Sequence, residues 1–212
     1  INGLCNPTWQ APIALQAIDP QADYLAPCAI IDYEHPAILA KAAELRRAHP
    51  GPLALTRASF EFVRDAIHHS WDARQGPVTL TASEVLQSGY GYCFAKSHLL
   101  AALLRANGIA AGLCYQRLSV AGHGAPYCLH GLNAVLLPGF GWYRVAARGN
   151  KPGVAAEFDP PHERLAFALQ DAHEADLPEI HPASEELAAR SRVLEAKFAD
   201  FGISAQVVDA HP

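Results

Sequence analysis

The chain has 212 residues, of which 50% are hydrophobic and 17% are charged, and its formal net charge is −5. A chain of this length and apolar content can bury a sizeable core within a single domain. Nucleic acids and anionic membranes require a basic surface, so the negative charge and the lack of any Lys/Arg-rich run argue against both as partners. No apolar run in the sequence is long enough to span a bilayer.

Five cysteines are scattered through the chain without CxxC spacing, and their number is odd. A chain of this size does not need disulfides to stabilise its core, so we expect a reducing, cytoplasmic compartment. Cys114 and Cys128 fall on predicted neighbouring strands and are interpreted as buried apolar residues, with a disulfide between them as the open alternative.

Three helices are predicted before residue 90. Pro36 starts the first, because proline favours the first helical position, and His49-Pro50-Gly51-Pro52 ends it. Thr56 is predicted to cap the second, whose apolar residues share one face: Phe60, Val63 and Ile67. Thr81-Ala82-Ser83-Glu84 has the capping-box pattern of a third, short helix.

A fourth helix is predicted over residues 93–107, directly after Gly89-Tyr90-Gly91-Tyr92. Its first residue, Cys93, would lie at the positive end of the helix dipole, which favours the thiolate form. The preceding glycines let a substrate carbonyl approach the backbone N–H groups, as a nucleophile requires. A buried structural cysteine is an equally frequent outcome at such a position, because cysteine is among the most buried residue types.

Strands are predicted after this helix, over residues 109–120, 128–137 and 140–146. The second alternates around His130 and ends at Pro138-Gly139. A helix-borne cysteine and a strand-borne histidine are the parts of a thiol–imidazole pair. The expected fold class is α+β, with the nucleophile helix packed on an antiparallel sheet.

The strand register can be predicted from the turn. A three-residue connection, Leu137-Pro138-Gly139, pairs Leu136 with Phe140 and therefore places Ala146 opposite His130. Directly opposite side chains lie about 4.5–5.5 Å apart at Cβ, so a carboxylate at 146 could hold the imidazole. Alanine cannot.

Four features together resemble the core of the transglutaminase-like cysteine enzymes: Gly91-Tyr92-Cys93, the segment over residues 103–109, His130 and Gly141-Trp142-Tyr143. The resemblance covers roughly residues 60–161, with its motifs in the family's order. It implies a papain-like catalytic geometry with Cys93 as nucleophile and His130 as base. It also implies an aspartate after the histidine strand, at the position where this chain has Ala146.

The missing aspartate leaves alternatives open. Losing the orienting group of a Ser-His-Asp site costs on the order of 10⁴ in turnover, whereas a cysteine dyad can lose less because its thiol ionises more easily. Asn150 and Asp159 are weak substitutes for the third member, since both residue types favour turns. Ala146 therefore also motivates a second hypothesis, a catalytically weakened domain that binds a peptide or protein.

Several other residues are weaker candidates. Gln87 could donate to an oxyanion, although a surface glutamine at a helix end is the more frequent case. Tyr92, Trp142 and Gln116 are ambiguous between substrate contact and core packing. The pair His68-His69 is interpreted as solvated or capping, because no metal-ligand spacing such as HExxH accompanies it and adjacent histidines on a helix point apart.

The sequence as a whole predicts one transglutaminase-like domain over residues 1–212, with its core over about 56–161. An N-terminal helical part and a C-terminal loop and helix extension are expected to pack on that core, the last helix over Glu185–Phe198. The expected function is a cysteine-dependent hydrolase or acyltransferase acting on amide bonds of a peptide, protein or small amide. This chemistry requires no metal or cofactor. A purely structural domain is the third hypothesis, and it predicts an inert Cys93.

Overall fold

The computed structural model describes residues 13–182. Its helices are α1 (Pro36–Ala48), α2 (Pro52–Ala66), α3 (Ser70–Ala73), α4 (Ala82–Ser88) and α5 (Cys93–Arg105), with a 3₁₀ turn η1 over Gln21–Tyr24. The main antiparallel sheet has the order β6-β5-β4-β9 and consists of β6 (Gly141–Val145), β5 (Tyr127–Leu137), β4 (Ala111–Ser119) and β9 (Ala175–Asp176).

Three two-stranded pairs complete the structure: β1 (Gln16–Ala17) with β10 (Glu179–Ile180), β2 (His68–His69) with β3 (Tyr90–Gly91), and β7 (Glu157–Asp159) with β8 (His162–Arg164).

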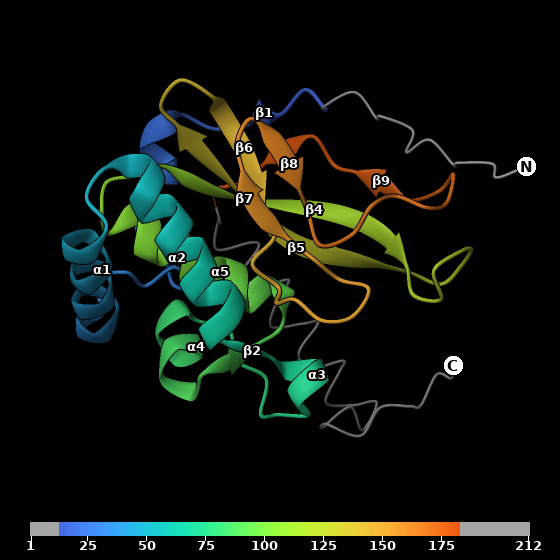
Figure 1. The fold of residues 1–212 in the computed structure, drawn as a ribbon, viewed down its shortest axis with the longest axis horizontal. Helices are drawn as coiled ribbons and strands as arrows, with labels where there is room; N and C mark the ends of the chain where they lie inside the picture. Colours follow the sequence, from blue (N-terminus) through green and yellow to red (C-terminus); the bar gives the residue numbers. More distant parts are fainter. Residues whose placement is uncertain (1–12, 183–212) are drawn as a thin grey trace, which may run out of the picture.

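Helix α5, which begins with Cys93, lies at the centre of the fold. It contacts α1, α2 and α4 as well as β4 and β5, and Figure 1 shows it between the other helices and the sheet. Its residues from Ala95 to Arg105 are all buried. A helix buried on every side is typical of a domain core. The predicted α+β class, with a helix packed on an antiparallel sheet, is confirmed.

Local sequence signals correctly predicted α1 and α4. Proline opens α1 at Pro36. In α4 the Thr81 hydroxyl accepts a hydrogen bond from the Glu84 N–H at 3.2 Å, and the Glu84 carboxylate accepts one from the Thr81 N–H at 3.0 Å. This capping box fixes where α4 begins, and Gly89 ends it with a φ of 75°.

The predicted start of α2 was wrong. The helix begins at Pro52 rather than after Thr56, and Thr56 is buried inside it. Gly51 precedes the helix with a φ of 96°, a conformation that favours glycine, and proline at the first position needs no hydrogen-bond partner for its nitrogen. The Gly51-Pro52 pair was interpreted only as the end of α1, although it also starts α2.

The predicted register between β5 and β6 was also wrong, by two residues. Leu136 pairs with Trp142 instead of Phe140, because the tight turn runs from Leu137 to Phe140, whose N–H donates to the Leu137 carbonyl at 3.1 Å. Gly139 supplies the positive φ of 81° that this turn needs. Continued past the end of β6, the observed register places Ala146 opposite Leu132, diagonal to His130.

The segment after Asn150 was predicted to be rich in loops, and it contains short strands as well. One of them, β9, adds an edge strand to the main sheet beside β4. The helix predicted over Glu185–Phe198 lies outside the described residues, as do residues 1–12.

The expectation for the two strand cysteines holds for one of them. Cys114 is buried, whereas Cys128 is exposed, and neither forms a disulfide. Cys128 lies on the part of the β4–β5 hairpin that extends past the helices (Figure 1), so nothing in the core covers it.

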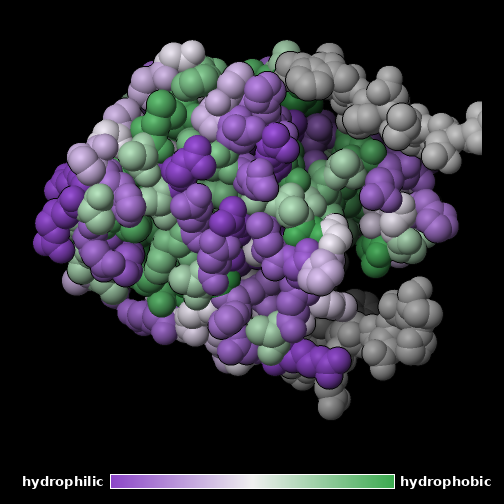
Figure 2. All heavy atoms as spheres, in the orientation of Figure 1, coloured by the Kyte–Doolittle hydropathy of each residue, from purple (hydrophilic) through white to green (hydrophobic). Residues whose placement is uncertain are grey.

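Hydrophilic side chains gather at the left edge of Figure 2, where α1 lies in Figure 1, with apolar side chains among them. Between residues 13 and 182, no helix has both the length and the apolar character needed to cross a membrane.

Candidate active site

Cys93 is the first residue of α5, and Tyr92, in an extended conformation, is its N-cap. The Cys93 Sγ accepts a hydrogen bond from the Gly131 N–H of β5 at 3.4 Å and another from the Phe94 N–H. Two backbone donors therefore converge on the sulfur where the helix begins. Such N–H groups are the donors that stabilise an oxyanion in acyl-transfer enzymes.

Gly131 allows this contact because it has no side chain. A Cβ at position 131 would lie 2.9 Å from the Phe94 Cα, a distance that real Cβ atoms do not show. The strand can touch the start of α5 only with glycine here. Sequence reasoning missed this residue, although a glycine inside a strand pattern and next to a candidate catalytic histidine signals close backbone approach.

Burial favours the uncharged forms of both Cys93 and His130. Burial raises the pKa of the Cys93 thiol, and this effect outweighs the Gly131 and Phe94 N–H donors and the positive charge of Arg148, which lower it. Burial, followed by the charge of Arg148, lowers the pKa of His130 to about 4. The thiolate expected from the helix dipole is therefore not the resting form. A neutral imidazole at neutral pH is the form that can accept the thiol proton.

His130 is 5% exposed and lies on β5, directly opposite Gln116 of β4. The Phe167 ring stands edge-on to the imidazole with the centroids 4.9 Å apart. Among the described residues, the buried Nε2 of His130 has no hydrogen-bond partner. The imidazole is thus enclosed by packing, and no residue between 13 and 182 fixes its Nε2 by a hydrogen bond.

The position of the missing aspartate is apolar and buried. Ala146 and its neighbour Ala147 are both enclosed in the core. The two weak substitutes are engaged elsewhere: Asn150 exchanges hydrogen bonds with the backbone of Ala156, and Asp159 accepts from Arg164 at 2.9 Å. Neither bonds to His130.

The weaker sequence candidates are spread over the molecule. Trp142 packs edge-on against the Tyr24 ring at 5.0 Å and pairs with Leu136, which lies about 20 Å along β5 from His130. The Gln87 amide lies 3.5 Å from the His35 ring instead of near Cys93. Only two of the four remain near the pair: Tyr92, which is stacked on the Phe94 ring, and Gln116, opposite His130.

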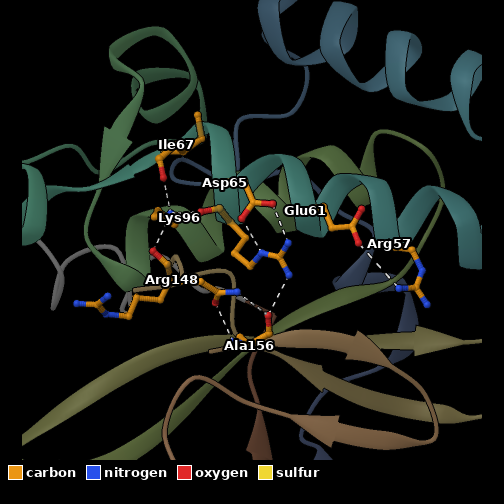
Figure 3. Close-up of polar contacts among 9 residues, drawn as sticks. Arg57, Glu61, Asp65, Ile67, Lys96, Arg148 and Ala156 are labelled. Carbon is orange, nitrogen blue, oxygen red and sulfur yellow. Dashed lines mark hydrogen bonds and ion pairs between the residues drawn. The ribbon is translucent and has the colours of Figure 1, made fainter. Parts of the chain in front are cut away.

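Lys96 is a buried cation one helical turn after Cys93, and sequence reasoning missed it. Its ammonium donates to the carbonyls of Arg64, Ile67 and Arg148 (Figure 3), and the last of these distances is 2.7 Å. Burial, followed by the charge of Arg148, lowers the pKa of Lys96 to about 7. Lys96 joins the C-terminal end of α2, the start of α5 and the loop after β6.

Arg148 supplies the nearby positive charge, and it too was missed. Its guanidinium forms an ion pair with Asp72 at 2.8 Å and lies 5.7 Å from the centroid of the Phe167 ring. It follows the end of β6, so strand periodicity gave no signal for it.

The interpretation of His68-His69 as solvated or capping holds in part for His69, which is the N-cap residue of α3 but makes no side-chain cap hydrogen bond and is half-buried. The two residues form strand β2, which pairs with β3 just before Cys93, and only His68 is exposed. The His69 ring lies edge-on to Tyr92 at 5.7 Å, and burial, as the largest cause, lowers its pKa to about 3. Two residues were too short a run to predict as a strand. His69 is therefore a second histidine near the nucleophile.

A cavity of about 330 Å³ opens beside this region. Its walls include His69, Asp72, Gly149 and Lys151. Within the part of the chain that the structure describes, no group of three or more His, Cys, Asp or Glu side chains could hold a metal ion.

Solved structures that align with part of this chain include the following three. A candidate cysteine protease from Cytophaga hutchinsonii is 16% identical, with a TM-score of 0.50, and the match covers 60% of this chain and 41% of that protein. The periplasmic domain of TgpA from Pseudomonas aeruginosa is 25% identical, with a TM-score of 0.44 and coverage of 61% and 48%. Red sea bream transglutaminase is 12% identical, with a TM-score of 0.42 and coverage of 55% and 27%.

The chain thus spans less than half the length of each of these structures, and no curated protein sequence matches it. Residues 40–147 match the sequence profile of the transglutaminase-like superfamily. This match covers just over half of the chain and includes α2, α4, α5 and the strands β4 to β6. The chain belongs to the transglutaminase-like superfamily.

Proposed function

We propose that the protein is a cysteine-dependent hydrolase or acyltransferase that acts on amide bonds of a peptide, protein or small amide. Cys93 is the proposed nucleophile and His130 the proposed base. Family membership supports this class of chemistry. The observation that carries the assignment is the hydrogen bond from the Gly131 N–H to the Cys93 Sγ, because it joins the residue after His130 to the sulfur.

The proposed reaction begins with a neutral pair. His130 accepts the thiol proton as the Cys93 Sγ forms a bond to the substrate carbonyl carbon, and the N–H groups of Gly131 and Phe94 are candidate donors to the oxyanion. The amide C–N bond then breaks as the imidazolium returns its proton to the leaving amine. Water or a second amine resolves the thioester, and the acceptor that reaches it decides between hydrolysis and acyl transfer.

The second candidate function is a catalytically weakened domain that binds a peptide or protein in the same place. Ala146 favours it, because the family's orienting carboxylate is missing and no described residue bonds to the His130 Nε2. This candidate predicts an ordinary reactivity of the Cys93 thiol.

The first experiment is the pH dependence of Cys93 alkylation by iodoacetamide, read at each cysteine by mass spectrometry. The proposal predicts that Cys93 reacts faster than the exposed Cys128 at pH 6–7 and that His130→Ala removes the difference. His69→Ala is the matched control, since His69 is the other histidine near Cys93. Loss of the difference only in His69→Ala would reassign the base. A Cys93 that stays inert in the unmodified protein would overturn the enzyme and favour the binding domain.

A further inference from the structure

Two buried polar atoms on directly opposite residues of β4 and β5 lack partners. Among the described residues, neither the His130 Nε2 nor the Gln116 Oε1 has a hydrogen-bond partner. Gln116 is 1% exposed and His130 is 5% exposed, so water does not readily replace a missing partner. A buried donor or acceptor without a partner costs about 1–3 kcal/mol, so an imidazole N–H and an amide oxygen in this situation favour each other.

The orientation of the Gln116 amide is determined by its surroundings. Its Nε2 donates to the Asp176 carboxylate at 2.9 Å and to the Phe167 carbonyl at 3.3 Å. Both of these groups only accept hydrogen bonds, so the NH₂ end must face them and Oε1 must face the other way. Asp176 is held in turn by Arg144 at 2.8 Å.

Two observations place Gln116 and His130 side by side. They are directly paired in the β4–β5 register, so their side chains lie on the same face of the sheet, with Cβ atoms about 4.5–5.5 Å apart. They also share Phe167, whose carbonyl accepts from Gln116 and whose ring packs against the imidazole. A carboxylate at this Cβ–Cβ distance could orient the histidine. Gln116 is at that distance, but it lies on β4, whereas the expected aspartate position, 146, follows β6.

We propose that Gln116 is the positioning residue of His130. Neither atom has a partner among the described residues, so the imidazole must turn to bring its Nε2–H to the Gln116 Oε1, which then accepts a hydrogen bond in place of the carboxylate missing at Ala146. The bond holds the imidazole in the tautomer whose Nδ1 is free to accept the Cys93 proton. A side-chain amide can fill this role, as the Cys-His-Asn arrangement of papain-like proteases demonstrates. The inference rests on the proposed function.

The test is the alkylation rate of Cys93 in Gln116→Met, a substitution that keeps the side-chain length and removes the acceptor. We expect the rate at pH 7 to fall at least about tenfold, with the pH profile shifted toward that of His130→Ala. Gln21→Met, an exposed glutamine of η1, is the matched control and should leave the rate unchanged. Thermal unfolding of each variant establishes that it is folded.

A second carboxylate separates positioning from a general structural effect. In an Ala146→Asp background the same Gln116→Met change should cost less than about threefold, because the introduced carboxylate would replace the lost acceptor. An equal loss in both backgrounds would overturn the positioning role. The positioning role would also be overturned if the Cys93 alkylation rate of Gln116→Met stays within twofold of the unmodified protein while His130→Ala still abolishes the faster alkylation. If His130→Ala itself has no effect, the proposed function fails instead.

The tautomer can be measured without changing Gln116. In a Cys93→Ala chain at pH 8, long-range ¹H–¹⁵N spectra of the histidines should show the His130 proton on Nε2. A proton on Nδ1 would overturn the proposal even if Gln116→Met does not fold.

Discussion

The two sides of the candidate site differ in how well they are supported. On the side of Cys93, the Gly131 N–H and the Lys96 ammonium tie the start of α5 to distant parts of the chain. On the opposite side, where relatives are expected to carry an aspartate, Ala146 offers only a methyl group. The scaffold that presents the thiol is therefore separable from the group that orients the base, and each side can be tested alone.

The largest effect is expected for Lys96→Met, which tests the side of Cys93. Three buried carbonyls would lose their shared donor, so the free energy of unfolding should fall by about 3–5 kcal/mol, measured by urea unfolding. Lys41→Met is the control, because Lys41 pairs with an exposed Glu44 on the surface. An equal change in both variants would contradict the structural role of Lys96.

The same substitution has a pH signature. The pKa of Lys96 is about 7 in the folded protein and near 10.4 in an unfolded chain, so between these values the unfolded state binds the additional proton. Its contribution to stability therefore rises with pH over this window and is lowest below pH 7. The unfolding free energy of the unmodified protein, compared with that of Lys96→Met, should increase from pH 7 to pH 9.

Ala146→Asp tests the other side. A carboxylate diagonal to His130 should replace the Gln116 amide as acceptor of the Nε2–H and, because it is charged, also stabilise the imidazolium. The Cys93 alkylation rate at pH 7 should then rise by about 10–100-fold, less than the full effect of a Ser-His-Asp carboxylate because position 146 is not directly opposite. Ala147→Asp is the matched control: it places an equally buried charge one residue further along the chain. A similar gain in both variants would point to a general electrostatic effect.

His98 provides a smaller test of how firmly α5 is anchored. Its Nδ1 lies 2.8 Å from the Leu80 carbonyl, and burial lowers its pKa to about 4. An unfolded histidine binds a proton below about pH 6.5, so stability from this residue is lost as the pH falls from 6.5 toward 4. Between pH 7 and pH 5 the unmodified protein should lose on the order of 1–2 kcal/mol more than His98→Asn. Equal losses in urea unfolding would contradict this.

The smallest effect is expected for Asp159→Ala. Asp159 forms an exposed pair with Arg164, and such pairs contribute little to stability because water screens them. The Cys93 alkylation rate should stay within twofold of the unmodified protein. A large fall would restore Asp159 as a third catalytic member and contradict the structure.

Local signals predicted the scaffold well. Pro36 and the Thr81–Glu84 capping box depend on neighbouring residues only, so α1 and α4 were recognisable from the sequence. The same is true of the order of helix and strands that carries Cys93 and His130. Gly51-Pro52 shows the limit of such signals, because one dipeptide both ended α1 and began α2.

The parts that could not be predicted depend on contacts between distant segments. Lys96 bonds to carbonyls 29 to 52 residues away, and His69 pairs with Gly91 across a strand of only two residues. The β5–β6 register depended on which three residues connect the strands. Residues 138–140 do so rather than 137–139, and this moves Ala146 from opposite His130 to the diagonal position.

β5 lies between β4 and β6 in the sheet, so the histidine has a neighbour on each side. The group that orients a catalytic imidazole can therefore change strands without any change of fold. A member of this superfamily that lacks the expected aspartate cannot be classified as inactive from that one position, and the residue facing the histidine from the preceding strand must be inspected as well.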